Sequence, residues 1–366
     1  MKRREFLTKT GIASAGALSV AACAQSDCEM GEAASQDEAR EWKMVTSWPR
    51  NFPGLGTGAA RLAESVTQMS GGRLTVKIYG AGDLVPAFEV FDAVSRGTAE
   101  MGHAAAYYWK GKSEAAQFFG SVPFGLNAQE MNGWLYFGGG LELWRELYEP
   151  FGLVPFPAGN SGVQMGGWFN KEINSVADLE GLKMRIPGLG GEVLRRAGGT
   201  PVNLPGSELF TALQSGTIDA TEWVGPYNDR AFGLFQAARY YYYPGWHEPG
   251  TTLECMVNKE AFDALPDDLK AIVENACAAE NDRMLAEFTA NNREALKAFR
   301  DNSDIEIRRF PEEVLTLLQD LSDDVVKSIA ATEPMAQRIF DSFVEYRDSV
   351  RDWQQLSEVA YFSARD

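Results

Sequence analysis

The chain has 366 residues, of which 45% are hydrophobic, 23% charged and 11% aromatic. This composition can bury a large core and excludes disordered and fibrous proteins, and the length is sufficient for two domains. The 34 basic residues are outnumbered by 51 acidic residues, which gives a net charge of −17. Because such a surface repels a phosphate backbone, we expect no nucleic-acid partner.

Residues 1–24 are predicted to be an export signal. The adjacent pair Arg3-Arg4 precedes a short Ala-rich apolar run over residues 11–23, which is shorter than the roughly 20 residues of a membrane-spanning helix. The pattern Arg-Arg-x-Phe-Leu resembles the twin-arginine signals of bacteria, with an ordinary secretory signal as the alternative. Cleavage after small residues would release a soluble periplasmic protein, whereas a lipobox interpretation makes Cys23 a lipid-anchored residue.

Residues 25–40 have the composition of an acidic linker. The signal carries four basic residues and one acidic residue, a net +3, so its removal changes the net charge from −17 to about −20. Cys28 lies in this linker, Cys255 in a strand-like run and Cys277 on a predicted helix. The last two could form a disulfide in an oxidising compartment or remain buried thiols, so disulfides cannot be assumed.

Strands and helices alternate along the first part of the chain. We predict a strand, a helix, a strand and a helix over residues 42–48, 57–69, 74–79 and 86–96. This order favours mostly parallel sheets covered by helices. Further strands are predicted over 163–169 and 183–186, and helices over 188–199, 267–302, 311–329 and 335–353.

One segment of the chain is repeated. Residues 91–100 align without gaps with residues 210–219, and in both segments a helix ends at a glycine and leads into a strand. The strands end near aromatic residues, Tyr107 and Tyr108 in one copy and Trp223 in the other. This duplication predicts two similar lobes with a cleft between them, although short cap-and-turn patterns also recur for local reasons.

The motifs of common enzyme classes are absent from the sequence. The chain has two histidines, His103 and His247, which argues against a His-based triad and a multi-His metal site. The residues Gly54, Gly56 and Ala59 match part of a dinucleotide-binding fingerprint. An exported cofactor-dependent oxidoreductase therefore stays as the alternative function, and the structural interpretation of these glycines is a turn that caps a helix.

An arginine and a set of oxygen-bearing residues are typical of anion binding and of cation binding, respectively. Arg185 lies in a strand that ends at a proline, where a rigid guanidinium can bind a carboxylate through two parallel hydrogen bonds, although such arginines also form structural ion pairs. Glu222 and Glu248, with the oxygen of Gln164 and a backbone carbonyl, have the chemistry that a hard cation prefers. From spacing alone, either glutamate could equally be a solvated surface residue.

The segments WKMVTSWP, GLKMRIPG and LQSGTIDATEW occur in this order at residues 42–49, 181–188 and 213–223. They resemble the extracytoplasmic solute-binding proteins of TRAP transporters, the tripartite ATP-independent periplasmic systems, over about residues 41–340. Residues 107–112 and 245–250, YYWKGK and GWHEPG, resemble the branch of this family that binds 2-oxo acids and lactate.

The resemblance implies an α/β protein with a two-lobed periplasmic-binding-protein fold, in which each lobe is a mixed or mostly parallel sheet flanked by helices. Lobe I would contain residues 41–163 and about 251–300, lobe II residues 164–250 and about 301–340, and a C-terminal helical extension residues 341–366. Such a protein is not an enzyme. It captures a small 2-oxo or 2-hydroxy monocarboxylate and delivers it to the small and large membrane subunits. The C-terminal helices resemble those of family members that exchange a helix between subunits. A homodimer is therefore an open alternative to a monomer.

The resemblance also implies roles for individual residues. Arg185 would bind the substrate carboxylate, with further polar contacts from Asn160, Gln164 and one of Tyr107 or Tyr108. A metal ion that bridges substrate and protein would be bound by Gln164, Glu222, the backbone oxygen of Trp223 and Glu248. Two glutamates and a monocarboxylate against one arginine leave a charge of about −2, so we expect Ca²⁺ in preference to Na⁺. A glutamine at position 248 would instead favour Na⁺.

Overall fold

The computed structural model describes residues 39–365. The predicted export signal, the Cys23 lipidation site and nearly all of the acidic linker lie outside these residues. Among the helices of the described part, none is both long enough and apolar enough to cross a membrane.

The first sheet has five strands in the order β2-β1-β3-β10-β4. Their bounds are β1 Arg40–Thr46, β2 Leu74–Tyr79, β3 Met101–Ala104, β4 Leu153–Asn160 and β10 Thr252–Asn258. The strands β2, β1 and β3 are parallel, whereas β10 is antiparallel to both β3 and β4. A late strand, β10, therefore completes a sheet that the N-terminal part of the chain begins.

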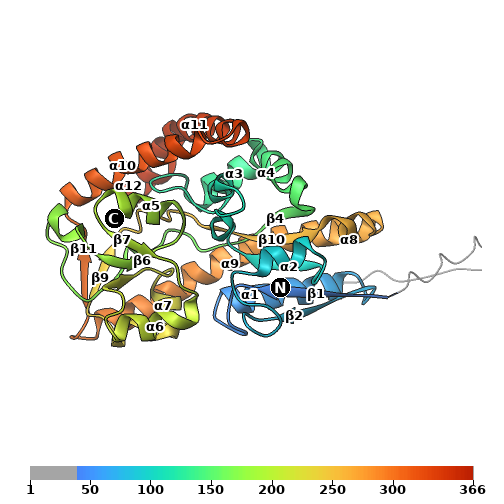
Figure 1. Ribbon diagram of the computed structural model, residues 1–366, viewed down its shortest axis with the longest axis horizontal. Helices are drawn as coiled ribbons and strands as arrows, with labels where there is room; N and C mark the ends of the chain where they lie inside the picture. The colour runs from blue at the N-terminus through green and yellow to red at the C-terminus, as the bar shows by residue number, and fades with distance from the viewer. Residues whose placement is uncertain (1–38, 366) are drawn as a thin grey trace, which may run out of the picture. The chain divides into compact units, whose positions relative to one another are not determined.

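The second sheet has six strands in the order β11-β9-β5-β8-β6-β7. Their bounds are β5 Gly167–Phe169, β6 Lys183–Arg185, β7 Thr200–Val202, β8 Ala220–Thr221, β9 Tyr240–Tyr243 and β11 Glu306–Arg309. Only β5 runs antiparallel to its neighbours, β8 and β9. Figure 1 shows the second sheet on the left and the first on the right. The predicted architecture of two mixed sheets flanked by helices is confirmed.

The helices enclose both sheets. Their bounds are α1 Leu55–Met69, α2 Val90–Ser95, α3 Ala128–Phe137, α4 Gly140–Tyr148, α5 Gly188–Arg196, α6 Gly206–Gln214, α7 Pro226–Phe232, α8 Lys259–Asp263, α9 Asp267–Arg300, α10 Glu312–Ala330, α11 Pro334–Gln354 and α12 Ala360–Arg365. The long helix α9 contacts α1 and β4 beside the first sheet and α7 beside the second. It therefore connects the two halves of the described chain.

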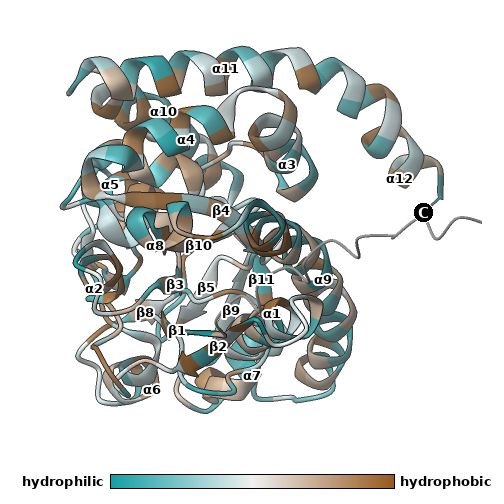
Figure 2. Cartoon of the chain, turned by 90° about the vertical axis from the view of Figure 1, so that its right-hand side faces the viewer, coloured by the Kyte–Doolittle hydropathy of each residue, from teal (hydrophilic) through white to brown (hydrophobic). Residues whose placement is uncertain are grey.

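The last helices of the chain extend beyond the two sheets and the helices that cover them. Helix α10 lies against α5, and α11 lies against α3, α4 and the 3₁₀ segment η2, Glu114–Phe119. Figure 2 shows α11 running along one side of the molecule and ending in α12, beyond the other labelled helices. The predicted C-terminal helical extension is thus present.

The glycines at the start of α1 are explained by local packing. Gly54 has a φ of +71°, and a Cβ atom there would lie 2.8 Å from the Phe288 ring. A Cβ atom at Gly56 would lie 2.4 Å from the backbone oxygen of Pro49. Both positions need glycine because neighbouring groups leave no room for a side chain. The interpretation of this segment as a helix-capping turn is therefore confirmed.

The repeated segments have the same local structure. Gly97 and Gly216 both have a φ of +72°, and they follow α2 and α6. Each leads into a strand, β3 or β8, that is parallel to a neighbour in its own sheet. The two strand ends bring the 3₁₀ segment η1, Ala106–Trp109, and Trp223 toward a common cavity.

The two cysteines of the described chain are buried free thiols. Cys255 lies in β10 and Cys277 in α9, within one hydrophobic cluster. Of the two sequence-based alternatives, the structure has the unpaired form.

Candidate functional site

Arg185 is held rigidly at the end of β6. Its side chain is 1% exposed, its Nε donates to the Leu204 carbonyl oxygen at 3.1 Å, and its Nη1 forms an ion pair with Glu222. The guanidinium lies over the Trp223 ring, 5.0 Å from the ring centroid. Its Nη2 has no hydrogen-bond partner in the described chain, and Arg185 lines the cavity. One buried cationic donor is therefore left for a ligand.

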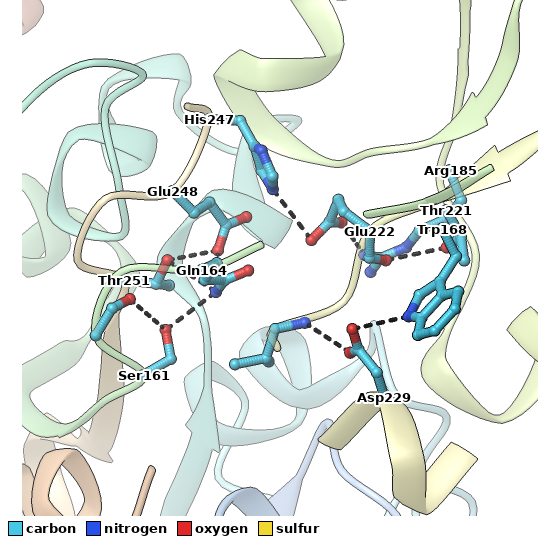
Figure 3. A network of polar contacts seen from close by, with 12 residues as sticks. Ser161, Gln164, Trp168, Arg185, Thr221, Glu222, Asp229, His247, Glu248 and Thr251 are labelled. Carbon is cyan, nitrogen blue, oxygen red and sulfur yellow. Dashed lines mark hydrogen bonds and ion pairs between the residues drawn. The ribbon is translucent and has the colours of Figure 1, made fainter. Parts of the chain in front are cut away.

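Two carboxylates and an imidazole are close together beside this arginine. Glu222 follows β8, while His247 and Glu248 lie in the turn after β9, and one ligating atom from each lies within 4.8 Å of the others. All three are buried, and His247 Nε2 is 3.4 Å from Glu222 Oε2 (Figure 3). Burial, followed by repulsion from Glu222, raises the pKa of Glu248 to about 7. A bound cation would remove this repulsion.

The amide of Gln164 supplies a neutral oxygen to the same place. Its Nε2 donates to Glu248 Oε2 at 2.8 Å, to Ser161 Oγ at 3.0 Å and to Thr251 Oγ1 at 3.3 Å. Its Oε1 is buried and has no hydrogen-bond partner in residues 39–365. A buried unpartnered amide oxygen beside two carboxylates has the donor chemistry of a Ca²⁺ or Na⁺ site.

Aromatic and apolar side chains form much of the remaining cavity lining. Tyr107 and Tyr108 come from η1, and burial raises the pKa of Tyr108 to about 12, so its hydroxyl stays protonated at neutral pH. Trp48, which follows β1, donates its ring N–H to His103 Nδ1 at 2.8 Å. The remaining lining residues are Leu55, Ser161, Gln164, Arg185, Trp223, Val224, Thr251 and Leu253.

Asn160 is the predicted substrate contact that does not line this cavity. Its Nδ2 donates to the Gly250 oxygen at 3.2 Å and to Thr252 Oγ1 at 3.4 Å, and its Oδ1 accepts from Gly162 N at 2.8 Å. The amide therefore joins the end of β4 to the start of β10. All the other predicted site residues are brought to one cavity, with Glu222 and Glu248 beside it.

Several residues that sequence reasoning missed support the predicted ones. Ser161 and Thr251 fix Gln164, and Thr251 also donates to Glu248. Asp229 accepts a hydrogen bond from Trp168 Nε1 at 3.0 Å (Figure 3). It accepts another from the Tyr241 hydroxyl at 2.7 Å. The Thr251 hydroxyl, three residues after Glu248, gave no distinctive sequence signal because small polar residues are common in turns.

Another buried carboxylate, Glu254, fixes η1. Glu254 in β10 is 0% exposed and accepts hydrogen bonds from the Trp109 ring N–H and from the Tyr148 hydroxyl, the latter at 2.9 Å. Both donors are neutral, and burial raises the pKa of Glu254 to about 7. Glu254 thus connects the first sheet to the segment that carries Tyr107 and Tyr108.

Comparisons with known proteins identify relatives of this chain. The family model for bacterial extracellular solute-binding proteins, family 7, matches residues 44–333. A monocarboxylate 2-oxoacid-binding periplasmic protein of Nostoc sp. is 42% identical over 361 residues, which cover 99% of this chain and 98% of that protein.

Two solved structures of TRAP periplasmic solute-binding proteins are similar throughout. The protein from Colwellia psychrerythraea, with bound calcium and pyruvate, is 43% identical with a TM-score of 0.87, covering 89% of this chain and 100% of that one. The protein from Pseudoalteromonas atlantica, with bound sodium and pyruvate, is 44% identical with a TM-score of 0.87, covering 89% of this chain and 99% of that one.

The raised pKa of Glu254 predicts a specific pH dependence of stability. The folded state keeps this carboxyl protonated up to about pH 7, whereas the unfolded chain ionises it from about pH 4.5. This carboxyl therefore lowers the unfolding free energy of the wild type between these pH values, and Glu254→Gln lacks that contribution. In urea denaturation, the unfolding free energy of the variant relative to that of the wild type should increase by about 3 kcal/mol as the pH rises from 4.5 to 8. Parallel pH curves for the two proteins would contradict this.

Proposed function

The chain belongs to bacterial extracellular solute-binding protein family 7, the solute-binding proteins of TRAP transporters, and on this premise we propose that it captures a small 2-oxo or 2-hydroxy monocarboxylate, such as pyruvate, together with a metal ion. A periplasmic solute-binding protein is not an enzyme, so the oxidoreductase alternative is wrong. The observation that carries the proposal is the unpartnered, buried guanidinium nitrogen of Arg185 beside a cluster of cation ligands.

Arg185 is the anchor for the substrate carboxylate. A carboxylate placed at its free nitrogen gains charge-assisted hydrogen bonds in a region shielded from water. The apolar wall formed by Trp48, Leu55 and Leu253 offers no second cation. A second carboxylate in the substrate would be buried there without a partner, which favours a monocarboxylate over a dicarboxylate.

Gln164, Glu222, Glu248 and the backbone oxygen of Trp223 would hold the metal ion. With the substrate carboxylate present, the three negative charges exceed the single charge of Arg185 by about two, which favours Ca²⁺ over Na⁺. The relatives from Colwellia and Pseudoalteromonas hold calcium and sodium, respectively, with pyruvate. The bound ion supplies electrostatic attraction for the substrate oxygens.

Two lobes would close over this cavity. We assign residues 41–163 and about 251–300 to lobe I and residues 164–250 and about 301–340 to lobe II, which agrees with the strands that form each sheet. Lobe I contributes Tyr107 and Tyr108 to the cavity, and lobe II contributes Arg185. Because a ligand touching both lobes stabilises the closed form, closure can signal occupancy to the small and large membrane subunits.

The C-terminal helices support a homodimer. Trp353, Leu356 and Tyr361, on α11, the following π-helical turn and α12, are 65%, 79% and 61% exposed. Large apolar side chains grouped at the end of a helix favour a protein partner. A cavity of about 140 Å³, lined by apolar residues such as Val122 and Phe343 and by the charged residues Asp323, Lys327 and Arg347, is a recess that a second copy could fill.

Replacement of Arg185 tests the substrate anchor. Arg185→Lys keeps the charge but loses the paired donors, and Arg185→Ala loses both. Calorimetric titration with pyruvate at saturating Ca²⁺ should show about 100-fold weaker binding for Arg185→Ala and an intermediate loss for Arg185→Lys. The exposed Arg195→Ala is the matched control. Wild-type affinity in Arg185→Ala would remove the anchor.

Glu248→Gln tests the choice of ion. The substitution preserves shape and removes one negative charge, so Ca²⁺ affinity should fall roughly 10- to 100-fold while Na⁺ still supports pyruvate binding. Glu280→Gln, at a similarly buried carboxylate that pairs with Arg61 and does not line the cavity, is the control. Unchanged Ca²⁺ affinity in Glu248→Gln would show that this carboxylate is no ligand.

Leu356→Glu tests the dimer contact. A charge among the exposed apolar side chains of Trp353, Leu356 and Tyr361 should convert a dimer to a monomer in sedimentation velocity. Gln355→Glu adds the same charge at the neighbouring position and should not. A wild-type protein that is monomeric at all concentrations would contradict the dimer.

A further inference from the structure

We propose that Asn228 is a positioning residue that couples the closure of the two lobes to the substrate anchor. Asn228 lies in α7 and is 0% exposed. It belongs to neither the predicted substrate contacts nor the predicted ion ligands. Because the movement concerns the two lobes defined above, this role rests on the proposed function.

The side-chain amide of Asn228 bonds to both lobes. Its Nδ2 donates to the backbone oxygen of Pro53 at 2.9 Å, and its Oδ1 accepts from Trp223 Nε1 at 3.3 Å. Pro53 lies between β1 and α1 of lobe I, whereas Trp223 follows β8 of lobe II. The partners of both hydrogen bonds lie outside α7, so neither bond is a helix cap. One amide group thus connects a lobe I carbonyl to a lobe II indole.

The indole on this amide is part of the binding cavity. The Trp223 ring lies under the Arg185 guanidinium, with 5.0 Å between the guanidinium carbon and the ring centroid. The contact is of the cation–π type and depends on the ring plane. Asn228 fixes that plane through the ring N–H. Contacts therefore run from the Pro53 carbonyl through Asn228 and Trp223 to the substrate anchor.

Aromatic packing surrounds this hydrogen-bonded bridge. The Phe52 ring of lobe I stacks on the Phe232 ring of lobe II, with centroids 4.1 Å apart and an interplanar angle of 26°. The Phe52 and Trp48 rings also pack edge to face with the Trp223 ring, with centroid separations of 6.3 Å and 6.2 Å, respectively. Separation of the lobes would break these contacts. Asn228 adds its hydrogen bonds beside this aromatic contact between the lobes, and its neighbour Tyr227 adds two more, from its backbone N–H to Asn292 Oδ1 at 2.9 Å and from its hydroxyl to Glu287 Oε1 at 3.0 Å.

Two variants of Asn228 remove one or both of its hydrogen bonds to Pro53 and Trp223. Asn228→Asp keeps the shape and an oxygen acceptor for Trp223 but loses the donor to Pro53, whereas Asn228→Ala loses both. At saturating Ca²⁺, stopped-flow tryptophan fluorescence should show pyruvate dissociating about three- to tenfold faster from either variant, with little change in association rate. Asn281→Ala removes a similarly buried amide that donates to Asn132 and should behave as wild type.

Small-angle X-ray scattering of the ligand-free proteins gives a readout that does not need substrate. Asn228→Asp should have a larger radius of gyration than wild type, because the closed form loses a bond. Should an Asn228 variant fail to fold, Phe52→Leu weakens the same contact from lobe I and should also speed dissociation.

Wild-type dissociation kinetics and scattering in Asn228→Asp, or in Phe52→Leu as the substitute, would overturn the proposed coupling. A wild-type protein that binds no pyruvate with Ca²⁺ would instead refute the proposed function. The scattering comparison would still test the bridge between the lobes.

Discussion

The burial of two like charges in one small region is the constraint on which the site depends. Glu222 and Glu248 are 0% and 4% exposed, and desolvated carboxylates of the same sign repel each other strongly. Arg185 compensates one of them, and Gln164 donates one hydrogen bond to Glu248 while its own amide oxygen stays unpartnered. The remaining negative charge favours a cation, and the free guanidinium nitrogen favours an anion. Ion, substrate and lobe closure are therefore expected to be coupled.

Much of the fold could be predicted from periodicity. The helices α1, α9, α10 and α11 and the strand β2 lie close to their predicted ranges because each has a clear helical or strand pattern. The strand β9 was not predicted, since four consecutive tyrosines show no alternation of polar and apolar side chains. The predicted strand over 163–169 is shorter, starting at Gly167, whose φ is +118°. Sheet order could not be read locally because β10 pairs with strands about 100 or more residues away.

The site was predictable only where family motifs fix a residue type. Arg185, Glu222 and Glu248 came from such motifs, and the sequence alone left each of them with an ordinary structural alternative. Residues whose roles depend on partners that are distant in the sequence left no recognisable pattern in the sequence. Asn228 contacts Pro53, which lies 175 positions earlier, and Glu254 acts through Tyr148, so their roles follow from the fold and not from spacing.

Calorimetric titration of metal-stripped protein tests the central claim most directly. Pyruvate would be titrated with and without Ca²⁺, and Ca²⁺ with and without pyruvate. A shared site predicts that Ca²⁺ strengthens pyruvate binding about tenfold or more, and that pyruvate strengthens Ca²⁺ binding by the same factor, because coupling between two ligands is reciprocal. Pyruvate binding of equal affinity with and without the ion would contradict the shared site.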